Sequence, residues 1–244
     1  MQVGWQKIKN DTWFFLPETG TAVTGIWHID EVPYYFDEAC HLVTNQTVTV
    51  DGVKYQADGK GVLTEIPVIT DLPGQTHVMG TAVATEAQMR AYIQSVNPNV
   101  AQSVLDMIPY YLSEGEIEGV RGDIAFAQSC LETGNFAFHG SAVTLSQNNF
   151  CGLGVTSNGM KGNSFATPQL GIRAQIQHLK AYADSESLVQ GQIDPRFQYV
   201  QRGCAPYVEW LGIQENPSGR GWAAGANYGD AILRIWRAIL AMQV

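Results

Sequence analysis

Hydrophobic and polar residues alternate in short runs through the first quarter of the chain, and aromatic residues recur in these runs. Trp13, Tyr34 and Tyr55 lie 21 residues apart, and polar turns such as Asp51-Gly52 separate the runs. Each repeat predicts a β-hairpin, because short apolar runs joined by residues that tolerate positive φ form hairpins. A single hairpin cannot bury its own face, so we expect the hairpins to stack as a β-solenoid-like array.

From about residue 80 the apolar residues recur at intervals of three and four, which is typical of helices. The pattern predicts helices over 84–96, 101–112, 121–133, 172–182 and 228–242, with a Gly- and Asn-rich loop over 146–164. We therefore expect a multidomain chain. Residues 1–66 would form the β-hairpin repeat array, residues 67–79 a linker containing proline and glycine, and residues 80–244 a mainly α domain.

Composition narrows the possible functions. The chain has 244 residues, of which 45% are hydrophobic and 15% charged, and its net charge is −9. The acidic balance argues against a nucleic-acid partner bound through its phosphates. No apolar run reaches the roughly 20 residues of a membrane span, and the N-terminus lacks the basic and apolar stretches of a signal peptide. We expect a globular protein with no nucleic-acid partner and no membrane span.

Four cysteines are present, Cys40, Cys130, Cys151 and Cys204. They form no Cys-x-x-Cys pair, and no His lies at the spacing of a zinc site. We expect free buried thiols, with a Cys130–Cys151 bridge as the alternative. Neither a metal nor an organic cofactor is expected.

A carboxyl with the features of a general acid is predicted at Glu132. Gly134 suits the position that ends the 121–133 helix, so Glu132 lies in the last turn, where the helix dipole disfavours its charged form. Phe136 and Phe138 follow and could supply apolar walls. Both effects raise the pKa of a carboxyl, as a general acid requires near neutral pH. The alternative is a solvated glutamate at a helix end.

Two further segments could contribute to a site. The loop Gln147-Asn148-Asn149-Phe150-Cys151-Gly152 carries amide side chains that suit sugar hydroxyls and acetamido groups, although turn residues alone would explain it. Tyr228 begins the last helix and is either a phenol near the site or a core tyrosine.

Four segments in this order, at 127–134, 148–153, 165–172 and 222–228, resemble motifs of the bacterial N-acetylglucosaminidases of glycoside hydrolase family seventy-three. The resemblance covers roughly residues 82–242. It implies a lysozyme-like helical domain that cuts the β-1,4 bond between N-acetylglucosamine and N-acetylmuramic acid in peptidoglycan. It also implies catalytic roles for Glu132 and Tyr228, and substrate binding by Asn148, Asn149, Phe150 and Phe165.

Many members of that family carry a second acid thirty to forty residues after the first, and this chain has no Asp or Glu at the matching place. Asp123 lies on another side of its helix, and Asp184, Glu186 and Asp194 would need folding that the pattern does not predict. Either the N-acetyl group of the substrate replaces the missing base, or Tyr228 holds the attacking water.

The hairpins resemble the choline-binding cell-wall repeats of Gram-positive autolysins and phage lysins, on residues such as Gly4-Trp5 and Tyr34-Tyr35-Phe36. The resemblance implies aromatic cages that hold a quaternary ammonium by cation–π attraction. The expected cages are Trp5 with Trp13 and Tyr34, and Trp27 with Tyr34 and Tyr55. A purely hydrophobic spine of rings is the alternative. The expected partner is choline-bearing teichoic acid or another wall polymer.

These features together predict a peptidoglycan hydrolase, an endo-β-N-acetylglucosaminidase targeted to the cell wall by its aromatic repeats. It would be a phage endolysin released through a holin-type lesion, or a trimmed secreted autolysin. One alternative is a lysozyme-type enzyme or lytic transglycosylase acting after N-acetylmuramic acid, and another is a non-catalytic wall-binding protein. The oligomeric state is not predicted.

Overall fold

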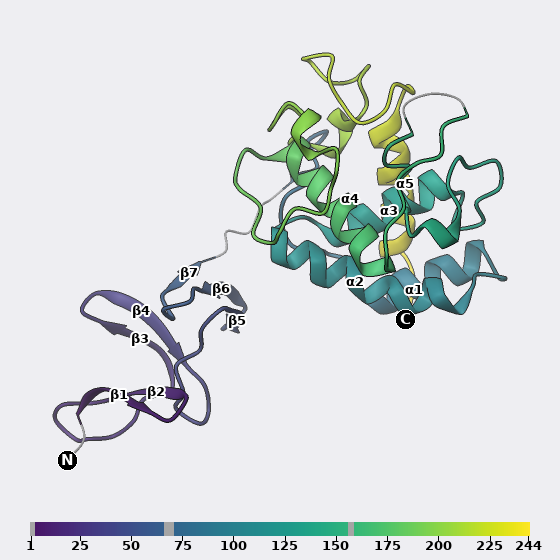
Figure 1. Ribbon diagram of the computed structural model, residues 1–244. Coiled ribbons are helices and arrows are strands. Elements are labelled where there is room, and N and C mark those ends of the chain that lie inside the picture. The colour runs from purple at the N-terminus through teal and green to yellow at the C-terminus, as the bar shows by residue number, and fades with distance from the viewer. Residues whose placement is uncertain (1–2, 66–70, 156–158) are drawn as a thin grey trace. The chain divides into compact units, whose positions relative to one another are not determined.

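The computed structural model describes residues 3–65, 71–155 and 159–244, and it divides into two compact units, Met1–Val68 and Ile69–Val244 (Figure 1). The first unit consists of β-hairpins and the second is rich in α-helix, as the sequence pattern predicted. The strands form three separate small sheets. Each unit has its own cluster of buried hydrophobic side chains.

Three hairpins follow one another in the N-terminal unit at a constant offset of 21 residues. β1 (Gly4–Ile8) pairs with β2 (Asp11–Phe15), β3 (Gly25–Ile29) with β4 (Val32–Phe36), and β5 (Gln46–Val50) with β6 (Val53–Ala57), to which β7 (Leu63–Glu65) adds. Asp51 and Gly52 both have positive φ, as a two-residue hairpin turn requires. The repeat seen in the sequence is therefore a structural repeat.

Backbone hydrogen bonds and buried side chains join successive hairpins. Phe36, at the end of β4, is fully buried and clusters with Val23 and Ile29 from the segments before it. The Leu42 N–H donates to the Thr12 carbonyl of β2 at 2.8 Å. This stacking supplies the apolar burial that a single hairpin lacks.

The described part of the C-terminal unit contains five α-helices: α1 (Glu86–Val96), α2 (Gln102–Glu118), α3 (Gly122–Thr133), α4 (Pro168–Ala183) and α5 (Tyr228–Leu240). Single turns of 3-10 helix at Leu145–Gln147, Phe197–Tyr199 and Val208–Leu211 lie in the connecting segments. Each helix was predicted from the sequence, but α2 and α4 are longer than expected.

α2 continues past residue 112, where the prediction ended it, because its last turns bury charged residues. Glu114 and Glu118 are almost fully buried. Arg173 and Lys180 of α4 form ion pairs with them at 2.8 and 3.0 Å. In a hydrophobic pattern, such glutamates predict that the helix has ended and that the chain is exposed to solvent. Gly119 ends α2 in the left-handed region, at φ 72°.

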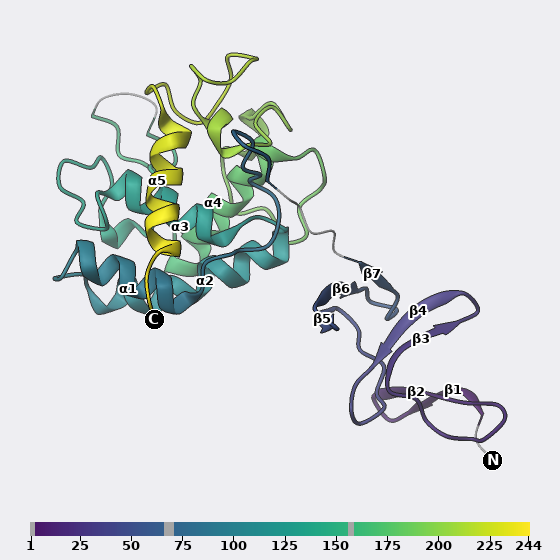
Figure 2. The same ribbon diagram turned by 180° about the vertical axis from the view of Figure 1, so that it is seen from behind.

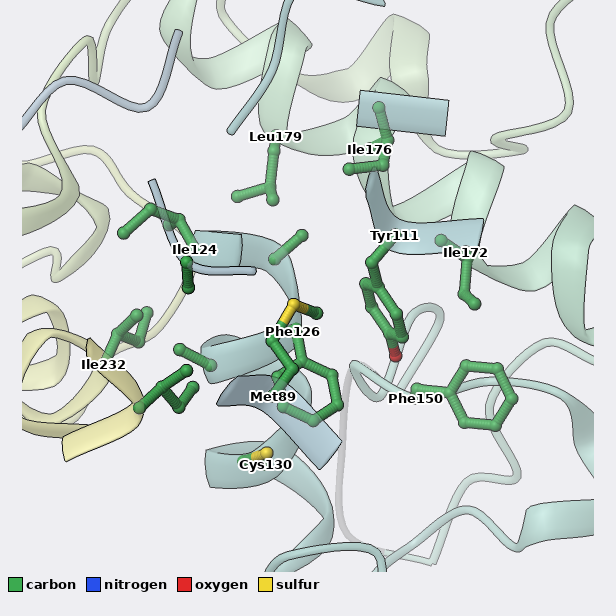
Figure 3. Close-up of a cluster of buried hydrophobic side chains, with 14 of the residues drawn as sticks. Met89, Tyr111, Ile124, Phe126, Cys130, Phe150, Ile172, Ile176, Leu179 and Ile232 are labelled. Atoms are coloured by element: carbon green, nitrogen blue, oxygen red, sulfur yellow. The ribbon is translucent and has the colours of Figure 1, made fainter. Parts of the chain in front are cut away.

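α3 is the central helix of this unit. Residues 121–130 are all buried, and α3 contacts α2, α4 and α5 (Figure 1 and Figure 2). Ile124 lies in one cluster with Ile176 of α4 and Ile232 of α5 (Figure 3). The sequence predicted a single apolar face, whereas the whole helix is enclosed except its last turn, which carries Glu132.

Part of the segment expected to be a linker packs on the helical unit. Asp71 forms an ion pair with Arg121 at 2.8 Å, and the Thr76 N–H donates to the Glu209 carboxylate at 2.9 Å. Residues 71–79 therefore belong to the unit and do not form a free linker. The rest of the expected linker lies outside the described residues.

All four cysteines are free thiols, and Cys130 and Cys151 are buried separately, so the alternative of a bridge between them is wrong. Within the described ranges, no helix has the length and apolar character needed to cross a membrane. The same residues include no cluster of three or more His, Cys, Asp or Glu arranged to hold a metal ion.

Candidate active site

Glu132 occupies the last turn of α3, as predicted. Gly134 ends the helix in the left-handed region at φ 60°, and its N–H points back to the carbonyls of Cys130 and Leu131. The Glu132 side chain is half-buried. Burial raises the pKa of this carboxyl above its usual value, because the charged form loses contact with water.

Phe136, one of the two expected walls of Glu132, has another position. Phe136 is 6% exposed and packs its ring against those of Phe126 and Phe150, so it belongs to the core. Gly152 faces the carboxyl instead, since a β-carbon at this position would lie 3.8 Å from Oε2 of Glu132. The loop that carries Gly152 therefore covers the acid, and it leaves Oε2 beside a residue without a side chain.

Tyr228, the first residue of α5, contacts Glu132 directly. Its hydroxyl donates a hydrogen bond to Oε1 of Glu132 and accepts one from the side-chain amide of Gln128 at 3.0 Å. The bond from Tyr228 lowers the Glu132 pKa and so opposes the larger effect of burial. Burial and the nearby Glu132 carboxyl raise the pKa of Tyr228 well above its usual value, so the phenol keeps its proton.

Asn149 and Phe150, two of the residues expected to bind substrate, are buried inside the loop. The Asn149 amide donates to the carbonyls of Leu153 and Asn163, both at 2.9 Å, and its oxygen accepts the Leu153 N–H at 3.0 Å. Phe150 is 1% exposed and lies in the main core. Their side chains shape the loop from within and offer no surface to a ligand.

Asn148 and Phe165, the other two expected binding residues, lie together at the edge of this loop. Asn148 adopts a positive φ of 52°, and its amide donates to the Phe165 carbonyl at 2.9 Å. Both side chains are half-buried. The Phe165 ring packs against the cluster of Cys151 and Leu153. The structure brings these two residues next to each other, and it packs Phe165 on the two residues that flank Gly152.

A cavity of about 200 Å³ opens beside the loop. Gly152 borders this cavity and also faces the Glu132 carboxyl, although Glu132 itself is not among the residues that line the cavity. The His178 and Trp222 rings in its wall pack edge to face, with centroids 4.8 Å apart. The lining combines loop backbone, aromatic rings and one guanidinium: Cys151, Gly152, Leu153, Gly154, Val155, His178, Tyr182, Arg196, Tyr199, Val200 and Trp222.

Most of these cavity residues were not predicted from the sequence. His178 and Tyr182 lie in α4 among core residues, and Arg196 and Tyr199 lie in a segment without a motif. No local pattern distinguishes them from ordinary helix and loop positions. His178 alone gave a weak signal in the sequence, because a histidine on the apolar side of a helix needs a polar partner. In the structure this partner is Asp194, whose Oδ2 lies 2.7 Å from Nδ1 of His178.

Three of the acids that were considered as a second catalytic group have partners elsewhere, and the fourth, Glu186, is exposed. Asp123 is fully buried, and its carboxylate accepts two backbone N–H groups from the segment before α1. Asp194 is fully buried against His178. Asp184 accepts the backbone N–H of Glu186 beyond the end of α4. None of these carboxylates hydrogen-bonds to the candidate acid in the part of the chain that the structure describes.

The expected cage of Trp5, Trp13 and Tyr34 is divided between two faces of a hairpin. Trp5 lies opposite Phe14 in the β1–β2 register, and Trp13 precedes Phe14 and therefore points to the other face. The Trp5 ring packs edge to face on Tyr34, with centroids 4.9 Å apart, whereas Trp13 packs on His41 at 4.9 Å. The three rings do not enclose one site.

The structure brings together two of the three residues of the second expected cage. Trp27 and Tyr34 are cross-strand partners in β3 and β4, and both pack against the small core of the unit. Tyr55 lies opposite Val48 in the third hairpin. These contacts resemble the hydrophobic-spine alternative more than an open cage.

A family model described as "Glucosaminidase: Mannosyl-glycoprotein endo-beta-N-acetylglucosaminidase" matches residues 108–240, which include both Glu132 and Tyr228. The chain therefore belongs to the glucosaminidase family.

Individual similar proteins either match only part of the chain or have low sequence identity to it. An uncharacterized protein of Borreliella burgdorferi is 44% identical over 118 residues, which is 48% of this chain and 57% of that protein, so the chain spans little more than half of this relative. Among similar solved structures, S. aureus autolysin E in complex with a muropeptide has 14% identity and a TM-score of 0.47, covering 80% of this chain and 82% of that one. The choline binding domain of a Streptococcus pneumoniae protein has 24% identity and a TM-score of 0.25, covering 26% of this chain and 84% of that one.

Proposed function

We propose that the C-terminal unit is an endo-β-N-acetylglucosaminidase that cleaves the β-1,4 bond between N-acetylglucosamine and N-acetylmuramic acid in peptidoglycan. The observation that carries the proposal is the environment of Glu132: burial keeps its carboxyl protonated to higher pH, and its Oε2 faces Gly152, a residue that borders a cavity. A general acid needs both features. Membership of the glucosaminidase family supports an N-acetylglucosamine-containing substrate.

The hydrogen bonds around Glu132 indicate how the proton is delivered. Oε1 accepts the Tyr228 hydroxyl, so the proton given to the glycosidic oxygen comes from Oε2. The bond between the glycosidic oxygen and the anomeric carbon breaks. The glycosidic oxygen keeps the electron pair and takes the proton, and the sugar gains oxocarbenium character. Negative charge then forms on Glu132, and the Tyr228 O–H stabilises it in a site partly shielded from water.

A second group must complete the reaction at the anomeric carbon. The Tyr228 hydroxyl is already bonded to Glu132 and Gln128, which argues against its use to hold the attacking water. Of the other acids that were considered, Asp123, Asp184 and Asp194 accept hydrogen bonds elsewhere, and Glu186 is exposed. These observations support the alternative in which the N-acetyl group of the substrate assists.

The cavity supports the binding of a sugar unit. Sugar-binding sites combine flat apolar surfaces with a few polar groups. Trp222 and Tyr182 contribute rings to the wall, and Arg196 contributes a cation. Asn148 and Phe165, at the edge of the neighbouring loop, are the expected binding residues whose side chains remain half-exposed.

Digestion of purified peptidoglycan tests the proposal. The wild-type protein should release fragments with reducing N-acetylglucosamine ends, identified by mass spectrometry after borohydride reduction. Glu132→Gln should release none, and the exposed Glu186→Gln should behave as wild type. Anhydro-muramic ends would instead identify a lytic transglycosylase. Walls that bind the wild-type protein but stay intact would identify a non-catalytic wall-binding protein.

We also propose that the N-terminal unit binds a cell-wall polymer, either choline-bearing teichoic acid or another. The Trp5 side chain is 39% exposed beside Tyr34, and exposed ring faces attract quaternary ammonium groups. Attachment of this kind would raise the concentration of the enzyme at an insoluble substrate. Such a protein acts at the cell wall, as an autolysin or a phage endolysin.

Retention on a tertiary-amine resin tests the choline version of this proposal. Trp5→Ala should weaken retention of the full chain. Tyr199→Ala, which removes a 71% exposed ring from the other unit, should not. Equal elution of wild type and Trp5→Ala would reject choline binding at this ring, and binding of both to purified walls would point to another polymer.

A further inference from the structure

A continuous series of buried hydrogen bonds leads from the interior of the helical unit to Glu132. Ser129 Oγ donates to Gln175 Oε1 at 2.9 Å, and Gln175 Nε2 donates to Gln128 Oε1 at 2.8 Å. Gln128 Nε2 donates to the Tyr228 hydroxyl oxygen at 3.0 Å, and Tyr228 donates to Glu132. We call these four donor–acceptor links the hydrogen-bond chain. It joins α3, α4 and α5.

The direction of the hydrogen-bond chain is set by a backbone carbonyl. Gln175 Nε2 also donates to the Ala125 carbonyl at 3.0 Å, and a carbonyl can only accept. The Gln175 nitrogen must therefore face the Ala125 carbonyl and Gln128. Gln128 then presents its oxygen to Gln175 and its nitrogen to Tyr228. The Tyr228 oxygen receives that N–H, and its own proton is directed to Glu132.

At the other end of the hydrogen-bond chain, the hydrogen bonds of Ser129 run in the same direction. The Tyr111 hydroxyl of α2 donates to Ser129 Oγ at 2.9 Å, which leaves the Ser129 proton for Gln175. Every polar group along the series has a partner. This completeness matters because a buried polar group without one costs free energy.

The amides of the hydrogen-bond chain cannot touch a substrate. Gln128 and Ser129 are fully buried, and Gln175 is 1% exposed. None of the three lines the cavity. Leucine or methionine would fill the same core volume without any demand for hydrogen bonds, so packing alone gives no reason for two buried glutamines here.

We propose that Gln128 and Gln175 are positioning residues, which orient the Tyr228 hydroxyl so that its proton always points to Oε1 of Glu132. Oε2, the oxygen beside Gly152, is thereby reserved for the proton delivered to the substrate. The inference rests on the proposed function, since it assigns how the proposed acid is held.

The pH dependence of the reaction can report on this arrangement. Besides Glu132 itself, the titratable groups that interact with it in the described part of the chain are Tyr228 from α5 and the Cys151 thiol from the loop. Burial raises the pKa of each well above its usual value, so both stay neutral near pH 7. The basic limb of the pH–kcat profile then follows Glu132. Loss of the Tyr228 donor raises the Glu132 pKa and moves this limb to higher pH.

Gln128→Glu tests the direction of the hydrogen-bond chain. A carboxylate at position 128 accepts from both Gln175 and Tyr228, so the Tyr228 proton turns away from Glu132. We expect kcat to fall about tenfold or more, as for one lost hydrogen bond to a charged group, with KM unchanged and the basic limb shifted upward. Gln175→Met should also lower kcat and shift the basic limb upward, but by less, because Gln128 keeps its contact with Tyr228 and loses only its fixed orientation.

Gln177→Met is the matched control. Gln177 is another fully buried glutamine of α4, but it bonds to the Gly191 carbonyl and to the Ile193 N–H. It should lower the thermal midpoint and leave the pH profile in place. A folded Gln128→Glu or Gln175→Met with the wild-type profile and kcat would overturn the inference, and Gln175→Met decides if Gln128→Glu does not fold. The proposed function fails separately, if Glu132→Gln still cleaves glycan.

Discussion

Replacement of Tyr228 by phenylalanine isolates the contribution of one hydroxyl, because the ring stays in place. Two hydrogen bonds are lost, the one to Glu132 and the one from Gln128. A hydrogen bond to a charged group contributes about 1.5–3 kcal/mol. This bond stabilises the carboxylate that forms as the proton leaves, so kcat should fall by about 10- to 100-fold.

The same substitution should move the pH profile and weaken the fold. The bond from Tyr228 lowers the Glu132 pKa, so its loss raises that pKa, and a general acid then stays protonated to higher pH. The basic limb of the kcat/KM profile therefore moves upward. Gln128 is fully buried and its amide loses an acceptor, which should lower the free energy of unfolding by about 1–3 kcal/mol.

Steady-state kinetics on soluble glycan fragments across pH, together with thermal unfolding, measure these effects. Tyr182→Phe is the control, because it also removes a phenol that donates a hydrogen bond, in this case to the Gly221 carbonyl at 3.0 Å. Its basic limb should stay where the wild-type limb lies. A Tyr228→Phe enzyme with unchanged kcat and an unmoved basic limb would refute the argument that this hydroxyl stabilises the Glu132 anion.

Three further outcomes concern stability. Burial raises the folded-state pKa of Glu132. The contribution of Glu132 to stability is therefore complete below its unfolded pKa of about 4.3 and is lost as pH rises through the folded pKa. Glu132→Gln should melt at a higher temperature than wild type at pH 8 and at the same temperature below pH 4, and a difference in melting temperature that does not depend on pH would contradict this. Gly122→Ala places a β-carbon 2.1 Å from a carbonyl oxygen of α2 and should cost about 1–3 kcal/mol in urea unfolding, while Gly225→Ala, with open space around it, should cost little. Arg173→Met leaves Glu114 buried without its cation and should cost about 3 kcal/mol, much of it recovered when Glu114→Gln is added; no recovery would argue against the charge as the cause.

Local features explain why part of the fold was predictable. The turns of the hairpins and the glycine that ends α3 act over a few residues, so a 21-residue repeat and the position of Glu132 at a helix end can be seen in the chain. The division of the first expected cage has a local reason too. Trp5 and Trp13 point to opposite faces because of the strand register, which composition does not specify.

Burial of polar residues explains most of the other differences. Glu114 and Glu118 extend α2 because α4 supplies their cations. Asn149 is an interior residue of the loop because carbonyls of that loop bind its amide. A hydrophobic pattern treats every such side chain as exposed, and only the partner decides otherwise.

By itself the sequence determined the hairpins, the helices, the turn that carries Glu132 and the order of motifs that place the chain among the glucosaminidases, since periodicity, caps and turns are short-range properties. The tertiary structure alone decided what surrounds the acid. Tyr228 follows Glu132 by 96 residues, and Gln175 follows Gln128 by 47. Such pairs meet only when α3, α4 and α5 pack together, and the directions of their hydrogen bonds depend on groups that no single segment contains.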